Sequence, residues 1–277
     1  MAEAAELTPD HIAAMNYNEL ISIVQETNRP PGGFESIRTI ALQAFLGPGK
    51  AVLEIGTSTG YSAIELAALT RARITAIDVN ARSLSVATER AHQAGVSEYI
   101  QFEQQDAHAL TYPDNAFDLV LCGNVTSLLA EPERALKEYA RVCKGGGFVA
   151  AIPMYYITAP PAGLVERVSA AIQVSLQVRY QDYWKGFFVR PGMELCWSRD
   201  YAFDDVSEGD VGRYVDELLQ RPHLQGLEPE TAKALQRVYS RYMMLFRENL
   251  TYMGFSILLL RKAYAGIEPQ LFAGHRL

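Results

Sequence analysis

The sequence predicts an α/β protein built on a doubly wound, mostly parallel sheet, with a helical cap inserted before the last strand. Two observations support this fold class. Between residues 51 and 152, short runs of β-type residues alternate with helical patterns, which is typical of a parallel sheet covered by helices on both faces. After Ile152, prolines and aromatic residues replace that alternation, until an apolar run over 254–262 resumes strand character.

The expected elements follow one another in regular order. Residue periodicity indicates helices over 34–46, 61–70, 82–94 and 133–142. The stretch ETNRPPGG (26–33) is expected to be an extended loop, because adjacent prolines and glycines disfavour a helix. The expected strands are AVLEI (51–55), RITAI (73–77), YIQFEQ (99–104), FDLVLC (117–122), GFVAAI (147–152) and GFSILLLRK (254–262).

Composition and charge exclude several classes of partner. The chain has 277 residues and a formal net charge of −7, with no long basic run, so nucleic acid is not an expected partner. No signal peptide is visible, and no apolar stretch reaches the roughly 18 residues of a membrane span. Cys122, Cys143 and Cys196 lack C-x-x-C spacing and are expected to be buried thiols in a reducing compartment. We therefore expect a cytoplasmic protein with no membrane partner, and a homo-oligomer stays open.

The stretch VLEIGTSTG (52–60) predicts a ligand-binding turn between a strand and a helix. Gly56 and Gly60 let backbone N–H groups and the helix N-terminus approach a ligand closely. The dinucleotide fingerprint G-x-G-x-x-G has a glycine where this chain has Ser58, and its third glycine is also missing. The turn is therefore poorly suited to bind a pyrophosphate, and a ligand without phosphate suits it better.

Two carboxylates after the next strands point to an adenosine site. Asp78 follows Gly56 by 22 residues, at the end of the second strand, where a carboxylate accepts hydrogen bonds from both hydroxyls of a ribose. Asp106 follows the third strand and is placed to accept a hydrogen bond from an adenine amino group.

These motifs carry a family resemblance. VLEIGTSTG, ITAIDV, QQDAHALTYPDNAFDLVL and PERALKEYARVCKGGGFVAAI resemble the successive motifs of class I S-adenosylmethionine-dependent methyltransferases. The resemblance is to the small-molecule branch that includes ubiquinone/menaquinone C-methyltransferases, and it covers about residues 50–152. Two departures are Ser58 for the usual glycine and Gly145 for the usual proline.

The resemblance implies a Rossmann-like cofactor domain, S-adenosyl-L-methionine as cofactor, and a role for each motif residue. Glu54 would orient the methionine amino group, and Asn124 would face the sulfonium at the mouth of the fourth strand. Independently of the resemblance, the prolines and glycines of 30–33 favour a flap over the site rather than a mere connector, with Arg29 or Asn28 near the cofactor carboxylate. The remaining implied contacts are Gly56, Thr57 and Gly60 with the methionine and ribose, Asp78 with the ribose diol, and Val79, Asp106 and Ala107 with the adenine.

We expect three regions in the chain. Residues 1–33 form an N-terminal helix and the flap. Residues 34–153 with 249–265 form the Rossmann-like cofactor-binding domain. Residues 154–248 form a helical cap that contributes the substrate region.

The segment directly after the fourth strand narrows the class of methyl acceptor. The stretch Cys122-Gly123-Asn124-Val125 contains neither the N-P-P-Y-like motif of enzymes that methylate amino groups of DNA bases or of glutamine, nor an aspartate that would ligate magnesium. We therefore expect metal-independent O-, N- or C-methylation of an apolar or aromatic small-molecule metabolite. Two alternatives stay open: an enzyme that uses the sulfonium for cyclisation or decarboxylation, and a cofactor-binding regulatory protein without activity.

Aromatic residues after the fifth strand are the candidates for the acceptor pocket. Tyr155 and Tyr156 come directly after that strand, at the sheet edge where ligands bind in open α/β sheets. They are expected to act in substrate binding and catalysis together with Asn124, and Trp184 in substrate binding. The alternative is that the aromatic residues of 155–203 pack the core of the cap.

Overall fold

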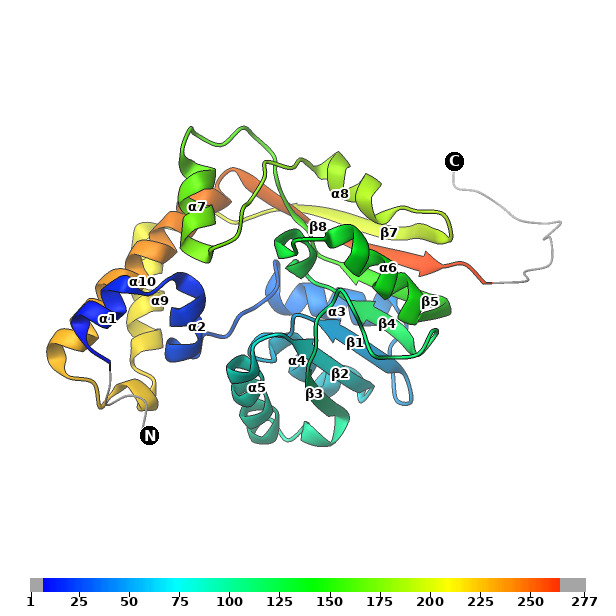
Figure 1. Cartoon of the computed structure of the whole chain (residues 1–277), viewed down its shortest axis with the longest axis horizontal. Helices are drawn as coiled ribbons and strands as arrows, with labels where there is room; N and C mark the ends of the chain where they lie inside the picture. The colour runs from blue at the N-terminus through cyan, green and yellow to red at the C-terminus, as the bar shows by residue number, and fades with distance from the viewer. Residues whose placement is uncertain (1–6, 265–277) are drawn as a thin grey trace.

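The computed structural model describes residues 7–264 and contains the predicted parallel sheet (Figure 1). Five strands run parallel in the spatial order β3-β2-β1-β4-β5. Glu54 in the central strand lies opposite Ala76 on one side and Leu121 on the other. The strands are β1 Ala51–Ile55, β2 Arg73–Asp78, β3 Ile100–Gln104, β4 Phe117–Leu121 and β5 Cys143–Ala151.

The sheet continues through three antiparallel strands. β8 (Met253–Lys262) pairs with β5, with β6 (Met154–Tyr156) and with β7 (Met193–Ala202). Leu259 lies opposite Ala150 of β5 and also opposite Trp197 of β7, so β7 occupies the other edge of β8. The region expected to be a helical cap therefore contributes two strands to the sheet.

Helices cover both faces of the sheet, as the sequence predicts. On one face α3 (Gly33–Gln43) and α4 (Tyr61–Thr70) pack with the strand residue Val52. On the other face α6 (Pro132–Val142) and α8 (Gln181–Phe188) pack with its neighbour Leu53. Because side chains alternate along a strand, consecutive residues of β1 pack into the cores on the two opposite faces of the sheet. The remaining helix of this domain is α5 (Ala81–Gln93).

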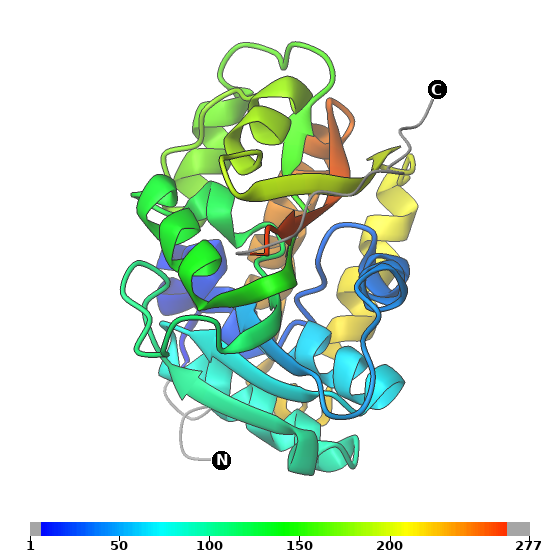
Figure 2. The ribbon, with the colours of Figure 1, turned by 90° about the vertical axis from the view of Figure 1, so that its right-hand side faces the viewer.

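A separate lobe, which we call the helical lobe, combines residues 7–24 with residues 208–250. It contains α1 (Pro9–Ala14), α2 (Tyr17–Val24), α9 (Glu208–Leu219) and α10 (Pro229–Leu250). These helices share a third buried cluster, which includes Leu20, Val215 and Leu235. The lobe lies to the left of the sheet in Figure 1, and Figure 2 views the molecule after a quarter turn, from the side of the sheet domain.

The N-terminal helices therefore pack with α9 and α10 rather than standing alone. The first helix of the expected cap region, α7 (Leu164–Ile172), contacts α10 and α2. α8 instead belongs to the core of the sheet domain. The outermost parts of the expected regions, residues 1–6 and residue 265, lie outside the described residues.

Candidate functional site

A cavity of about 770 Å³ lies between the carboxyl ends of β1, β2 and β4 and the helical lobe. Its volume is in the range of small-molecule and cofactor sites. The sheet side and the flap contribute seven of the predicted cofactor residues. These are Arg29, Glu54, Gly56, Thr57, Asp78, Val79 and Asn124.

The glycine turn after β1 needs its glycines for backbone conformation and for space. Gly56 has a φ of 70° and Gly60 a φ of 87°, in the left-handed region that favours glycine. A Cβ at Gly56 would lie 2.7 Å from a methyl carbon of Val125, and one at Gly60 would lie 2.8 Å from Cβ of Ala87. Gly60 does not line the cavity, so its part is to place the start of α4 behind the turn.

Glu54 is a buried carboxyl group on the cavity wall. Its Oε2 accepts a hydrogen bond of 2.7 Å from the Thr57 hydroxyl. Burial raises the pKa of Glu54 to about 7, against the opposing effect of that hydrogen bond. A cationic amino group beside it would favour the charged form, so the site suits the ammonium group of an amino acid.

Asp78 ends β2 and is held by two backbone amides. Its Oδ2 accepts from the Ser58 N–H at 2.8 Å, and its Oδ1 accepts from the Asn80 N–H at 2.9 Å. Each carboxylate oxygen retains a further lone pair. The side chain lines the cavity, so two hydroxyl groups of a ligand are suitable partners.

Asp106 and Ala107 lie outside the set of residues that line the cavity. Oδ1 of Asp106 accepts from the backbone N–H of His108 at 2.9 Å and lies 2.6 Å from Nδ1 of the same residue. These contacts, the backbone hydrogen bond first, lower the pKa of Asp106. Ala107 is buried in the core of the sheet domain. Their contact with adenine remains a prediction.

The predicted flap runs along the cavity, since residues 26–32 all line it. Backbone carbonyls tie its start to the sheet domain and the helical lobe. The Thr59 hydroxyl donates to the Glu26 carbonyl at 2.9 Å, and guanidinium groups donate to neighbouring carbonyls, Arg90 to Gln25 and Arg221 to Val24. Arg29 lies over the ring of Tyr61, 5.3 Å from its centroid.

Asn124 links the end of β4 to the start of β6. Its Oδ1 accepts from the Met154 N–H at 3.0 Å and from the Ser127 hydroxyl at 3.1 Å. Both Asn124 and Met154 line the cavity. The amide therefore positions the wall where the two strands meet.

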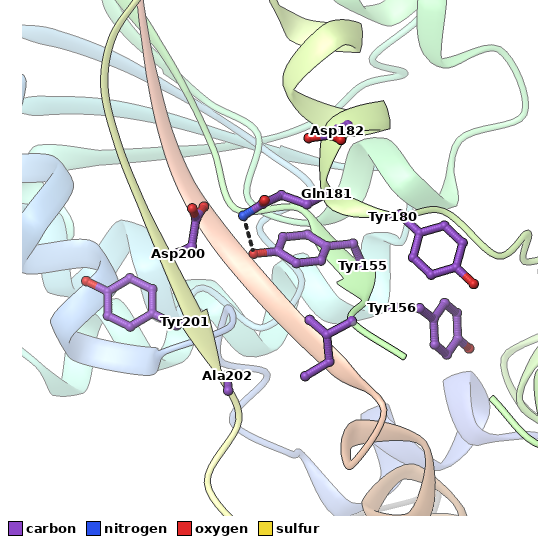
Figure 3. Close-up of a pocket in the computed structure, with 9 residues that line it drawn as sticks. Tyr155, Tyr156, Tyr180, Gln181, Asp182, Asp200, Tyr201 and Ala202 are labelled. Atoms are coloured by element: carbon purple, nitrogen blue, oxygen red, sulfur yellow. Dashed lines mark hydrogen bonds between the residues drawn. The ribbon is translucent and has the colours of Figure 1, made fainter. Parts of the chain in front are cut away.

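The structure places Tyr155 and Tyr156 away from this cavity, in a separate hollow of about 470 Å³ (Figure 3). The Tyr155 hydroxyl accepts from Gln181 at 3.1 Å and donates to the Phe255 carbonyl at 3.2 Å. The Tyr156 hydroxyl donates to Asn249 at 2.9 Å. Both residues are 3% exposed, and their hydroxyl groups form hydrogen bonds within the protein.

Trp184 also lies outside the cavity. It is 6% exposed and packs against Phe187 and Phe188 in the core beneath α8. The structure thus brings most of the predicted cofactor residues together but does not bring the predicted aromatic acceptor residues to them.

Other residues form the wall that faces the cofactor residues. They come from α2, the flap, the segment after β7, α9 and the end of α10, and sequence reasoning did not select them. Glu26 could have been selected from the sequence, because it is an acidic residue within the predicted flap. The others carry no local motif: Tyr17, Ile21, Phe203, Tyr214 and Leu250.

Residues 53–151 match the family model described as a methyltransferase domain. The chain is 34% identical over 128 residues to a phosphatidylethanolamine N-methyltransferase of Cereibacter sphaeroides, covering 46% of this chain and 62% of that protein. It is 31% identical over 154 residues to a 27-O-demethylrifamycin SV methyltransferase of Amycolatopsis mediterranei, covering 54% and 56%. It is 36% identical over 113 residues to a ubiquinone/menaquinone biosynthesis C-methyltransferase of Coxiella burnetii, covering 39% and 44%. The matched region thus spans between 44% and 62% of the length of these relatives.

Solved structures share the fold at low sequence identity. The MccD protein superposes with a TM-score of 0.72 at 21% identity, over 85% of this chain and 100% of that chain. The [4+2]-cyclase SpnF gives 0.68 at 21%, over 90% and 93%. A methyltransferase from Geobacter sulfurreducens in complex with S-adenosyl-L-homocysteine gives 0.63 at 19%, over 88% and 98%.

The parallel sheet, the glycine turn and the two carboxylates define the Rossmann-like fold of class I methyltransferases. The domain match and the relatives add that residues 53–151 are similar to the class I S-adenosylmethionine-dependent methyltransferase family. The cofactor of this family is S-adenosylmethionine, and the donor set of the cavity fits it: a carboxyl group for the ammonium and a second one for the ribose hydroxyls.

Three further findings bear on other expectations. Within residues 7–264, no group of three or more His, Cys, Asp or Glu side chains is arranged to hold a metal ion. None of the helices in that range combines the length and hydrophobicity of a membrane-spanning segment. Cys122 and Cys143 are buried, as expected, whereas Cys196 is exposed, because it lies in the edge strand β7.

Proposed function

We propose that the protein transfers a methyl group from S-adenosylmethionine to a small organic acceptor, without a metal ion. The observation that carries the proposal is the shared cavity. It joins Glu54, Asp78 and the flap, which suit the cofactor, to a wall of the helical lobe that is free for a second molecule.

The relatives support methyl transfer but differ in the atom that accepts it. Their names specify N-methylation, O-methylation and C-methylation. We propose an acceptor with an apolar or aromatic part, because Ile21, Phe203 and Leu250 line the cavity opposite the cofactor residues.

The residues of this chain act by binding and orientation. Bound S-adenosylmethionine supplies an electrophilic methyl group on a cationic sulfur. Glu54 holds the ammonium, Asp78 holds the ribose diol, and Asn124 fixes the wall beside the reacting centre. The flap excludes water from the cavity, and alignment with desolvation lowers the barrier of a displacement that needs little acid or base assistance.

The test is incubation with radiolabelled S-adenosylmethionine and a panel of amine, phenol and quinol acceptors. Formation of S-adenosylhomocysteine together with a labelled product supports the proposal. Tight cofactor binding without turnover of any acceptor would instead support a binding protein. Conversion of an acceptor without consumption of the methyl group would support cyclisation or decarboxylation, and the [4+2]-cyclase SpnF shares the fold.

We also propose that the enzyme acts in the cytoplasm, in small-molecule or secondary metabolism. The support for the location is that all three cysteines, Cys122, Cys143 and Cys196, are free thiols. Size-exclusion chromatography with light scattering measures the oligomeric state directly.

A further inference from the structure

A carboxylate surrounded by three tyrosines stands in the wall that faces the cofactor residues. Glu26 accepts hydrogen bonds from the hydroxyls of Tyr17 at 2.7 Å, Tyr239 at 2.6 Å and Tyr214 at 3.0 Å. We call these four residues the Glu26 cluster. Its members come from α2, the flap, α9 and α10, so the cluster joins segments that are distant in sequence.

The cluster is buried yet reaches the cavity. Glu26 is 8% exposed, and it lines the cavity together with Tyr17 and Tyr214, whereas Tyr239 is fully buried behind them. Burial and the nearby Glu26 carboxylate raise the pKa of Tyr214 to about 12 and raise those of Tyr17 and Tyr239 as well. The phenols therefore stay neutral donors at physiological pH.

The negative charge of Glu26 has no cationic partner within residues 7–264, since no salt bridge to it is formed there. Arg90 and Arg221 lie nearby, but they donate to backbone carbonyls of residues 24–26 and to the Thr59 carbonyl and Thr27 hydroxyl. A buried, hydrogen-bonded carboxylate without a counter-ion favours a cationic ligand.

The other charged groups of the cavity already have suitable partners. Glu54 and Asp78 suit the ammonium and ribose of the cofactor, and Arg29 is expected near its carboxylate. Glu26 is the charged residue of the cavity lining left for the second molecule.

The chemistry of the cluster favours an alkylated ammonium group. Three phenol donors occupy most of the hydrogen-bonding capacity of the carboxylate, so it offers charge rather than several directed acceptors. The rings of Tyr17 and Tyr214 and that of Phe203 line the same cavity. Aromatic side chains bind quaternary ammonium ligands by cation–π attraction, and the carboxylate beside them adds a negative charge.

We propose that the Glu26 cluster binds an alkylammonium group of the methyl acceptor, and that Glu26 thereby determines substrate specificity. This inference rests on the proposed function, because it assigns the second molecule of the same cavity. Glu26 acts as a recognition group and takes no proton from the acceptor.

The experiment compares two probes of the same shape and different charge. Choline and its neutral isostere 3,3-dimethyl-1-butanol are titrated by calorimetry into the protein saturated with S-adenosylhomocysteine. We expect choline to bind at least tenfold more tightly than the alcohol. In Glu26→Gln, whose amide oxygen still accepts from the phenols, this preference should vanish while the affinity for S-adenosylhomocysteine stays within twofold.

The matched control is Tyr239→Phe, which removes one hydrogen bond from the cluster but leaves its charge. It should retain the preference for choline. Equal binding of the two probes by the wild-type protein, or an undiminished preference in Glu26→Gln, would overturn the proposal. A parallel loss of S-adenosylhomocysteine affinity in Glu26→Gln would also overturn it, because Glu26 would then belong to the cofactor. Failure of the wild-type protein to bind S-adenosylhomocysteine would instead contradict the proposed function.

Discussion

The Ser58 amide donates a 2.8 Å hydrogen bond to Oδ2 of Asp78, and Ser58 does so from a left-handed backbone conformation with a φ of 49°. This is the position where the family motif has glycine. Asp78 would have to lose its contact with the turn if Ser58 moved to a relaxed conformation. The two residues therefore hold the glycine turn against the end of β2, at a cost in backbone strain.

Ser58→Gly should relieve that strain and raise the free energy of unfolding by about 0.5–1 kcal/mol, because glycine adopts positive φ without steric penalty. Urea denaturation measures it. The control is Ser85→Gly, at an exposed position within α5, where glycine should lower stability by about 1 kcal/mol. A loss of stability in both variants would show that Ser58 makes a favourable contact that outweighs its backbone strain.

Replacement of Asp78 by Ala should weaken binding of S-adenosylmethionine by about 1.5–3 kcal/mol, through loss of charge-assisted hydrogen bonds to the ribose. Calorimetry gives the affinity. Asp78→Asn can keep an acceptor for one of the two backbone amides and should lose less. Unchanged affinity in the alanine variant would contradict the assignment of Asp78 to the ribose of the cofactor.

Glu54 should make both stability and cofactor affinity depend on pH. Its folded-state pKa of about 7 lies above the value of 4.5 for an ordinary glutamate, so the folded protein binds more protons between these values. The free energy of unfolding should therefore fall as pH rises from about 4.5 to 7. Cofactor affinity should change in the opposite direction, because the ammonium group needs the ionised carboxylate.

The variant Glu54→Gln tests the direction of these two pH dependences. At pH 8 the variant should gain on the order of 1–3 kcal/mol of stability, since it buries no charge. It should also lose at least tenfold in affinity for S-adenosylmethionine, because it lacks the negative charge that partners the ammonium. Urea denaturation at pH 5 and pH 8 measures the first effect, and calorimetry the second. Identical pH dependence of stability in the variant and the wild type would contradict the assignment of this titration to Glu54.

The sheet and the part of the cavity wall at the glycine turn were predictable because their sequence signals are local. β1 and α4 have the predicted bounds, 51–55 and 61–70, because a largely apolar strand, a glycine turn and a helical pattern follow one another without interruption. β5 begins at Cys143, earlier than the expected start at 147, because the glycines of 145–147 lie within the strand instead of separating it from the helix before it.

The strand β7 was not predictable from alternation. The register shifts between Leu195 and Trp197, so Cys196 is an extra residue that breaks the period of two. The cavity wall that the helical lobe forms was not predictable either, since its residues meet only after α2, α9 and α10 have packed together. Tyr155 and Tyr156 follow the correct strand, but their hydroxyls bond within the core, and Met154 lines the cavity instead.

The burial of these two tyrosines changes the expected effect of their substitution. Tyr155→Phe and Tyr156→Phe should each cost about 0.5–1.5 kcal/mol of stability by removing a buried hydrogen bond, with cofactor affinity unchanged. Thermal denaturation and calorimetry separate the two effects. Tyr214→Phe is the comparison on the cavity wall, where acceptor turnover should respond instead. A large fall in kcat/KM for Tyr155→Phe at unchanged stability would restore its catalytic role.

The flap should become protected when the cofactor binds. Among the described residues, no hydrogen bond is donated by the backbone N–H groups of Thr27, Asn28 and Arg29, although all three residues line the cavity. These amides should exchange rapidly in the free protein. Addition of S-adenosylhomocysteine should slow their exchange at least tenfold, because closure over the ligand excludes water, and exchange over 17–33 should slow with them.

Arg221 tests how the flap is held. It donates to the carbonyls of Val24 and Gln25 and to the Thr27 hydroxyl, so Arg221→Ala should release the start of the flap from the helical lobe. We expect faster exchange of Glu26, whose N–H donates to the Ile21 carbonyl, and a cofactor affinity about three- to tenfold lower. The amides of α6, which lie outside the cavity lining, serve as the internal control for global stability. If Thr27, Asn28 and Arg29 exchange equally fast with and without S-adenosylhomocysteine, the segment does not close over the cofactor.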